Sequence, residues 1–209
     1  MKKIILTLCT CLFLLSLGGC SASVETKAEE TVTSFLTNLE EGKLEEAYTY
    51  VEEDADTAFS SFQKQKQSIT EYFTTNSADE ETLDVINQIF SDLLKSFTKE
   101  HKITEVTKVS DEEATVKVTL TIADPDAISD KMVDIDISGF MSEIASDALE
   151  VYTSDGEEAA NTFVMSKLAS WLQTTYTDAL TGIGTIEENT TFTVKKVDDK
   201  WLISNMEVE

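Results

Sequence analysis

The stretch that decides the fold is Glu113-Ala-Thr-Val-Lys-Val-Thr-Leu-Thr-Ile-Ala-Asp-Pro-Asp126. Apolar residues alternate with threonine and lysine from position 114 to position 122, which is the period-2 pattern of a strand with one buried face and one solvent-exposed face. Asp124 and Pro125 then end the strand and begin a helix, because aspartate is a favoured N-cap and proline fits the first helical position. Strands with one solvent-exposed face are typical of antiparallel sheets.

Three other segments are predicted to pair into the same sheet. Residues 103–109 are rich in β-branched side chains and are joined to the central strand by Ser110-Asp111-Glu112, which predicts a hairpin. Residues 191–197 and 201–208 form a second predicted hairpin over Asp198-Asp199-Lys200. The sequence therefore indicates about four antiparallel strands.

The remaining apolar residues recur with a helical period of 3.6. They predict helices around residues 32–39, 44–51, 59–73, 83–97, 125–148 and 160–179. Gly42 follows the first of these, where a helix C-terminus favours a left-handed residue. The order of helices, hairpin, helices, hairpin favours an antiparallel α+β fold over alternating βαβ units. With one proline and no Gly/Ser-rich linker, we expect a single α+β domain over residues 28–209.

The start of the chain has the three-part layout of a secretory signal. Lys2 and Lys3 precede a mostly apolar run over residues 4–17, and small residues follow it. Such a run is too short to cross a bilayer comfortably, where about 20 apolar residues are needed. We therefore expect residues 1–19 to be a signal peptide that is removed.

The end of this segment, Leu17-Gly18-Gly19-Cys20, resembles the lipobox of bacterial lipoproteins. The resemblance implies that Cys20 is the lipid attachment site and carries a thioether-linked diacylglycerol. Residues 20–27 would then be the lipidated N-terminus and a short tether, and the protein would stand on the outer face of the cytoplasmic membrane. The alternative is an ordinary secretory signal cleaved elsewhere, with Cys20 a spare thiol. Cys9 and Cys11 would be removed together with the signal peptide. The mature chain would then contain one cysteine, Cys20, and could form no internal disulfide.

Three segments also resemble a known fold family. Thr37-Asn-Leu-Glu-Glu-Gly-Lys-Leu-Glu-Glu-Ala-Tyr48 is similar to the opening of nuclear-transport-factor-2-like domains, and Phe192-Thr-Val-Lys-Lys-Val-Asp-Asp-Lys-Trp201 to their end. The central strand is similar to that of uncharacterised Gram-positive lipoproteins with this cone-shaped fold. The resemblance implies a curved antiparallel sheet wrapped by helices around a pocket, and implies no particular activity. The additional helices are expected to fill or cover the mouth of the cone.

The net charge of the chain limits the kinds of molecule that it can bind. The chain has 16 lysines, no arginine and 40 acidic residues, a net charge of −24. Without Lys2 and Lys3 the balance is 14 − 40 = −26. This charge excludes nucleic acid as a partner, since it repels phosphate backbones. Because there is no arginine, the protein cannot bind an anionic ligand through the two parallel hydrogen bonds that a guanidinium group donates.

No complete catalytic or metal-binding set is present in the sequence. His101 is the only histidine, and we expect it to be solvated beside charged neighbours. The run Asp134-Ile-Asp136-Ile-Ser138-Gly139 follows half of a calcium-loop pattern but has Ala145 where a glutamate would be needed. We therefore expect no catalytic residue, no cofactor and no metal.

These observations support three hypotheses of function. The first is a membrane-anchored, extracytoplasmic, non-catalytic binding module for an unknown protein, peptide or apolar small molecule. The second is an isomerase- or hydrolase-like enzyme that uses carboxylates in the cone cavity, with tyrosines such as Tyr48 and Tyr72 available. The third is an acidic trap for cationic peptides. Trp171, Tyr176 and Trp201 could line a pocket, although their spacing favours a place in the core.

Overall fold

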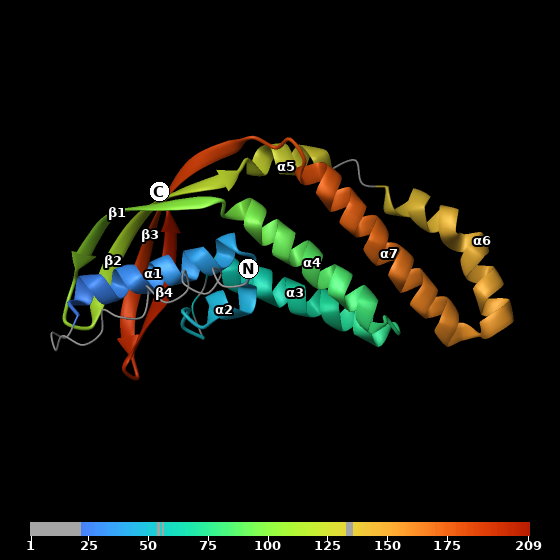
Figure 1. Cartoon of the computed structure of the whole chain (residues 1–209), viewed down its shortest axis with the longest axis horizontal. Coiled ribbons are helices and arrows are strands. Elements are labelled where there is room, and N and C mark those ends of the chain that lie inside the picture. The colour runs from blue at the N-terminus through green and yellow to red at the C-terminus, as the bar shows by residue number, and fades with distance from the viewer. Residues whose placement is uncertain (1–21, 54, 56, 133–135) are drawn as a thin grey trace, which may run out of the picture.

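The computed structural model describes residues 22–53, 55, 57–132 and 136–209. Seven helices and four strands lie in this part of the chain (Figure 1). The elements are α1 (Val24–Glu40), α2 (Leu44–Tyr48), α3 (Ala58–Thr75), α4 (Glu80–Phe97), β1 (Glu100–Lys108), β2 (Glu113–Ala123), α5 (Pro125–Met132), α6 (Ile137–Asp155), α7 (Glu157–Leu180), β3 (Thr185–Val197) and β4 (Lys200–Val208).

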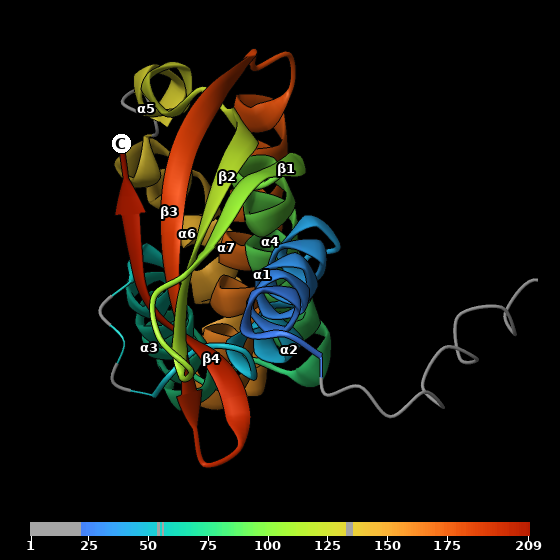
Figure 2. The same cartoon turned by 90° about the vertical axis from the view of Figure 1, so that its left-hand side faces the viewer.

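The four strands form one antiparallel sheet in the order β1-β2-β3-β4. β2 and β3 pair along the whole of β2, from Glu113 opposite Lys195 to Ala123 opposite Thr185. The long strands curve, as Figure 2 shows, so that the sheet has a concave face covered by helices. The predicted fold class, an α+β domain with a curved antiparallel sheet of about four strands wrapped by helices, is therefore confirmed.

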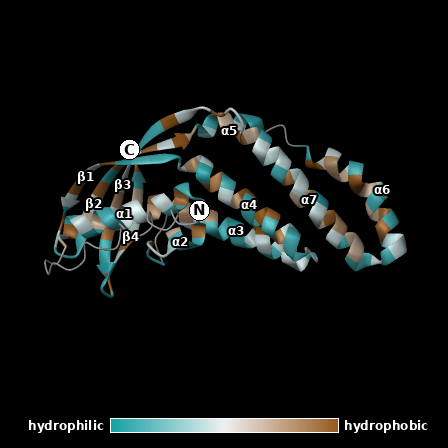
Figure 3. Cartoon of the chain, in the orientation of Figure 1, coloured by the Kyte–Doolittle hydropathy of each residue, from teal (hydrophilic) through white to brown (hydrophobic). Residues whose placement is uncertain are grey.

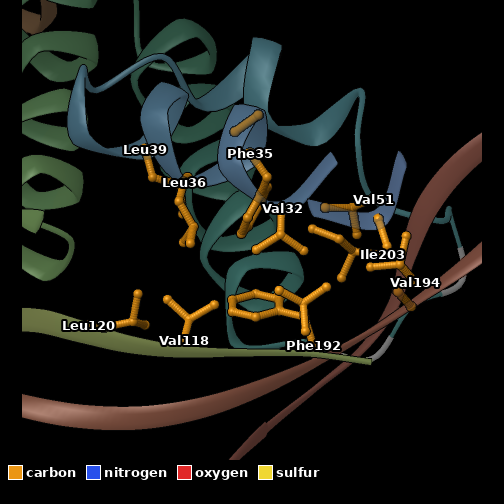
Figure 4. Packing of buried hydrophobic residues seen from close by; sticks show 14 of the residues in the cluster. Val32, Phe35, Leu36, Leu39, Val51, Val118, Leu120, Phe192, Val194 and Ile203 are labelled. Carbon is orange, nitrogen blue, oxygen red and sulfur yellow. The ribbon is translucent and has the colours of Figure 1, made fainter. Parts of the chain in front are cut away.

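The main core lies between α1 and the concave face of the sheet. Val32, Phe35 and Leu36 of α1 are almost fully buried and point toward side chains of β2 and β3 (Figure 4). The rings of Phe35 and Phe192 meet edge to face with centroids 6.1 Å apart. Gly42 follows α1 with φ +74°, the left-handed conformation predicted for this position.

A second apolar cluster holds the helices that extend away from the sheet. Phe73 of α3, Phe90 of α4 and Met165 of α7 are buried in it. α6 lies outside α7 and packs against it, with the rings of Phe140 and Trp171 stacked at 4.7 Å (Figure 1). Hydrophobic and hydrophilic residues are interspersed along both strands and helices (Figure 3), as amphipathic elements require.

The three largest differences from the sequence-based expectations concern where elements begin and end. The helix predicted over residues 125–148 is two helices, because α5 ends at Met132 and Asp136 caps the start of α6 by accepting a hydrogen bond from the Gly139 N–H at 2.8 Å. β3 begins at Thr185, whereas the pattern predicted its start at residue 191. α1 begins at Val24, within the segment 20–27 that the sequence assigned to the tether.

We predict that Phe192→Ala lowers the free energy of unfolding by about 3–5 kcal/mol, because Phe192 is 0% exposed and its loss leaves a cavity beneath α1. Urea unfolding monitored by circular dichroism measures the change. Val109→Ala is the control, since Val109 is 57% exposed and its truncation should change stability by less than about 0.5 kcal/mol. Equal losses for the two variants would contradict this account of the core.

Candidate functional site

The concave face of the sheet is not completely filled. A cavity of about 300 Å³ lies between the helices α3 and α4 and one end of the sheet, which is formed by the end of β2, the start of β3 and the end of β4. Most of its lining is apolar. The lining residues are Phe59, Phe62, Leu94, Phe97, Thr98, Leu120, Ile122, Glu188, Thr190, Met206 and Val208.

The cavity arises from a difference in length between the elements. β3 has 13 residues and spans about 43 Å, whereas α1 has 17 residues and spans about 26 Å. α1 therefore cannot cover the whole concave face. The rest of that face is covered by the side chains of Phe59 and Phe62 at the start of α3 and by the end of α4. These bulky side chains leave space between themselves and the strands.

Two threonine hydroxyls in the cavity lining are unsatisfied. Thr98 and Thr190 are each 1% exposed, and neither Oγ1 has a hydrogen-bond partner among the residues that the structure describes. An unpaired buried hydroxyl costs about 1–3 kcal/mol. Thr98 sits at the junction where α4 ends, and the next residue, Lys99, donates its N–H to the Thr121 carbonyl of β2 at 2.9 Å. The backbone thus holds Thr98 against the sheet.

One carboxylate lies in this mostly apolar lining. Glu188 of β3 is paired with Leu120 of β2, and residues paired across antiparallel strands have their side chains on the same face of the sheet. Glu188 is half-buried and makes no hydrogen bond or ion pair with the described part of the chain. The polar groups of the cavity are therefore Glu188, Thr98 and Thr190.

None of these three residues is among the candidates predicted from the sequence. A signal for two of them is present in retrospect, because Glu188 and Thr190 are in phase with the inward residues Phe192 and Val194. Polar side chains at inward positions of a strand mark a site that the core does not fill. The pattern was missed because the strand was predicted to begin only at residue 191. Thr98 has no such periodicity, since it follows the end of α4.

Other hollows on the described surface fit a ligand less well. One of about 480 Å³ is lined by polar and charged side chains along α3, among them Glu45, Lys66 and Thr70. Another, of about 350 Å³, lies among α3, α4 and α7 and shares Phe62 with the cavity. Tyr176 lines that hollow and is partly buried against the second apolar cluster. Neither hollow is lined by a residue of the sheet.

The expectation that His101 is a solvated surface residue is wrong. Its side chain is only 16% exposed, and its Nδ1 lies 2.6 Å from Oε1 of Glu40, with which it forms a hydrogen bond. The reason is the register of the edge strand, because His101 pairs with Leu120 and so takes the inner face beneath the last residue of α1. The pair ties α1 to β1 and lies outside the cavity lining.

The tyrosines considered for catalysis do not meet in the cavity. Tyr72 is 54% exposed on α3. Tyr48 lines a separate hollow beside Ser60 and Gln63, and burial raises the pKa of its phenol to about 12. Trp201 packs against the main core, and its indole Nε1 is buried without a partner in the described residues.

The remaining sequence-based site predictions concern metal and lipid. Within the described residues, no cluster of three or more His, Cys, Asp or Glu side chains could hold a metal ion. Asp136 is a helix cap, and Asp134 lies outside the described residues. Cys20 and the segment 1–19 also lie outside them. No described helix has the length and apolar character needed to span a membrane.

No protein-family model matches the sequence, and no curated protein matches it either. Solved structures with a similar arrangement include an NTF-2-like protein of unknown function from Shewanella oneidensis MR-1, with 11% identity and a TM-score of 0.38 over 88% of this chain and 96% of that one. Another is described as a calcium/calmodulin dependent protein kinase II association domain, from Xanthomonas campestris, with 13% identity and a TM-score of 0.38 over 90% of this chain and 91% of that one. At these identities and TM-scores, the similarities assign this chain to no family and say nothing of its function.

We predict that Thr190→Val raises the free energy of unfolding by about 1 kcal/mol in the ligand-free protein, because it removes an unpaired buried hydroxyl and keeps the side-chain shape. Thr31→Val is the matched control. The Thr31 hydroxyl donates to the Lys27 carbonyl at 2.8 Å, so its loss should lower stability by about 1 kcal/mol. Thermal and urea unfolding measure both variants, and a loss at Thr190 as large as that at Thr31 would contradict the assignment.

Proposed function

We propose that this protein is a lipid-anchored, extracytoplasmic binding module that holds a small apolar molecule in the cavity of its cone. The observation that carries the proposal is the apolar cavity of about 300 Å³, whose lining includes two threonines with buried, unpaired hydroxyls. Ligand sites are typically concave and mostly apolar with a few polar groups, and 300 Å³ is at the small end of their range. A small ligand is therefore expected.

The physical basis for binding is burial of apolar surface. A methylene group transferred from water into an apolar site contributes about 0.8 kcal/mol, and a factor of ten in affinity corresponds to about 1.4 kcal/mol. Each methylene that fits the cavity should therefore strengthen binding roughly fourfold. A polar group on the ligand can also satisfy Thr98 and Thr190, whose hydroxyls are costly to leave unpaired.

The proposed location rests on the sequence around Cys20. Two acyl chains on this cysteine would give durable anchoring, whereas a single chain holds a protein only marginally. Since α1 begins at Val24, a lipid on Cys20 would keep the domain close to the bilayer. The net charge would repel anionic headgroups, so that the lipid rather than a protein surface would provide the attachment.

The other two hypotheses have less support. An isomerase-like enzyme would need convergent acids or phenols in the cavity, and the lining contains one carboxylate and no tyrosine. A trap for cationic peptides is favoured by the net charge of −24 but by no particular surface. We therefore favour binding of a small apolar molecule without catalysis.

A series of straight-chain alcohols tests the cavity. We predict that affinity rises roughly fourfold with each added methylene and then stops rising once the chain fills the cavity. Isothermal titration calorimetry with the purified full chain measures the series, and Leu120→Trp, which places a larger side chain in the lining, should abolish binding. Affinity that is independent of chain length, or that survives in Leu120→Trp with unchanged folding, would contradict the proposal.

The anchor is tested by a cysteine substitution. We predict that Cys20→Ser moves the protein from the membrane fraction to the soluble or secreted fraction, because no diacylglycerol can be attached. Fractionation of the producing bacterium followed by mass spectrometry of the N-terminal peptide measures the change. An unmodified Cys20 in the native protein, or an unchanged membrane fraction for the variant, would rule out the anchor.

A further inference from the structure

We propose that the molecule held in the cavity carries a primary amine, which binds Glu188 in its protonated form. This inference rests on the proposed function, because it assigns the ligand of the same cavity. It begins from the polar groups of the lining, which are one carboxylate and two hydroxyls. Their chemistry selects the polar group that a ligand must present.

The position of Glu188 makes it part of the cavity rather than of the outer surface. Its pairing with Leu120 places it on the inner face of the sheet, where Leu120 and Ile122 also line the cavity. Its neighbour Glu187 pairs with Thr121 and is exposed on the opposite face, as alternation along a strand requires. Glu188 is thus a carboxylate that reaches an apolar cavity without a cation among the described residues to neutralise it.

A protonated primary amine matches this set of groups in charge and in hydrogen bonding. An ammonium group has three donors and no acceptor, and each threonine hydroxyl has free lone pairs to accept a hydrogen bond. Glu188, Thr98 and Thr190 are the polar residues of the lining. The two threonine hydroxyls are buried and unpaired in the described structure, and each would gain a partner by turning toward the ammonium group. The bond to the carboxylate would be charge-assisted and stronger than one between neutral groups.

Other polar groups on the ligand fit the cavity less well. A ligand carboxylate would lie against Glu188 with no lysine in the lining to offset the repulsion. A neutral hydroxyl could pair with the threonines but would gain no charge-assisted bond from Glu188. The predicted order of affinity is therefore amine, then alcohol, then carboxylate, for ligands with the same apolar chain.

Octylamine, octanol and octanoate are probes of equal chain length that test this order. We expect octylamine, protonated at pH 7, to bind the purified full chain about tenfold more tightly than octanol, and octanoate to bind more weakly than both. Glu188→Gln should weaken octylamine binding about tenfold and leave octanol binding unchanged. Isothermal titration calorimetry gives the affinity and the stoichiometry, which should be one molecule per chain.

Glu187→Gln is the matched control, since it removes the same charge one residue away on the other face of the sheet. It should leave the octylamine affinity within about twofold of the unmodified protein, because exposed charges contribute little to a site on the far face. Equal losses in the two variants would mean that octylamine responds to the net charge alone and would overturn the inference.

The outcomes separate this inference from the function on which it rests. If octanol binds in the cavity but octylamine binds no more tightly, the amine assignment is wrong and the apolar binding site stands. If none of the three probes binds, the proposed function fails and the inference fails with it. If octylamine is preferred and the preference is lost only in Glu188→Gln, both are supported.

Discussion

The pairing of β2 with β3 is the constraint on which the rest of the structure depends. It extends over all 11 residues of β2 without a shift in register and fixes which side chains face the helices. Because side chains alternate between the two faces, Val116, Val118 and Leu120 all point to the concave side. A shift by one residue would turn this apolar row outward and place threonines and Lys117 against α1. The core and the cavity both follow from the one register.

The inward-facing residues of β3 contribute to the closed core at one end of the strand and to the cavity at the other. Near the β3–β4 turn, Phe192 and Val194 are completely buried beneath α1 and form the closed core. Farther along β3 the inward residues become Thr190 and Glu188, and the helix above them is replaced by the ends of α3 and α4. The change from phenylalanine and valine to threonine and glutamate coincides with the change from a filled to an open interior. The closed core near the β3–β4 turn stabilises the fold, and the other end of the sheet leaves a cavity with polar groups in its lining.

The helices beside the sheet shape the cavity without filling it. They were expected to fill or cover its mouth, and the start of α3 and the end of α4 do cover part of it. α7 instead packs against α4, and α6 packs against α7, away from the concave face (Figure 1). α7 thereby buries the far side of α4 in the second apolar cluster. It supports the helix whose end carries Leu94, Phe97 and Thr98 to the cavity.

Local patterns in the sequence predicted most of the fold, because periodicity depends on neighbouring residues. The alternation over residues 114–122 identified β2, and the glycine after α1 was correctly predicted to be left-handed. The start of β3 was missed because Glu187, Glu188 and Asn189 interrupt the apolar pattern that marks a strand. The break between α5 and α6 was missed because apolar residues continue through it with a helical period.

The candidate site could not be predicted from the same patterns. It joins residues of α3, α4, β2, β3 and β4 that are far apart in the chain, and its volume depends on how far α1 extends along the sheet. His101 shows the same limit, since its burial depends on Glu40, which is 61 residues away in sequence. Charged neighbours in the chain suggested a solvated side chain, but the strand register decides its environment.

The most direct test of the account is a methyl-resolved NMR titration of the full chain with octanol. The account predicts chemical-shift changes at the methyl groups of Leu94, Leu120 and Ile122, which line the cavity. Val32 and Val194, which lie in the closed core beneath α1, should be little affected. Changes confined to the outer surface of the helices, with the cavity methyl groups unmoved, would show that the cavity on the concave face of the sheet is not a binding site.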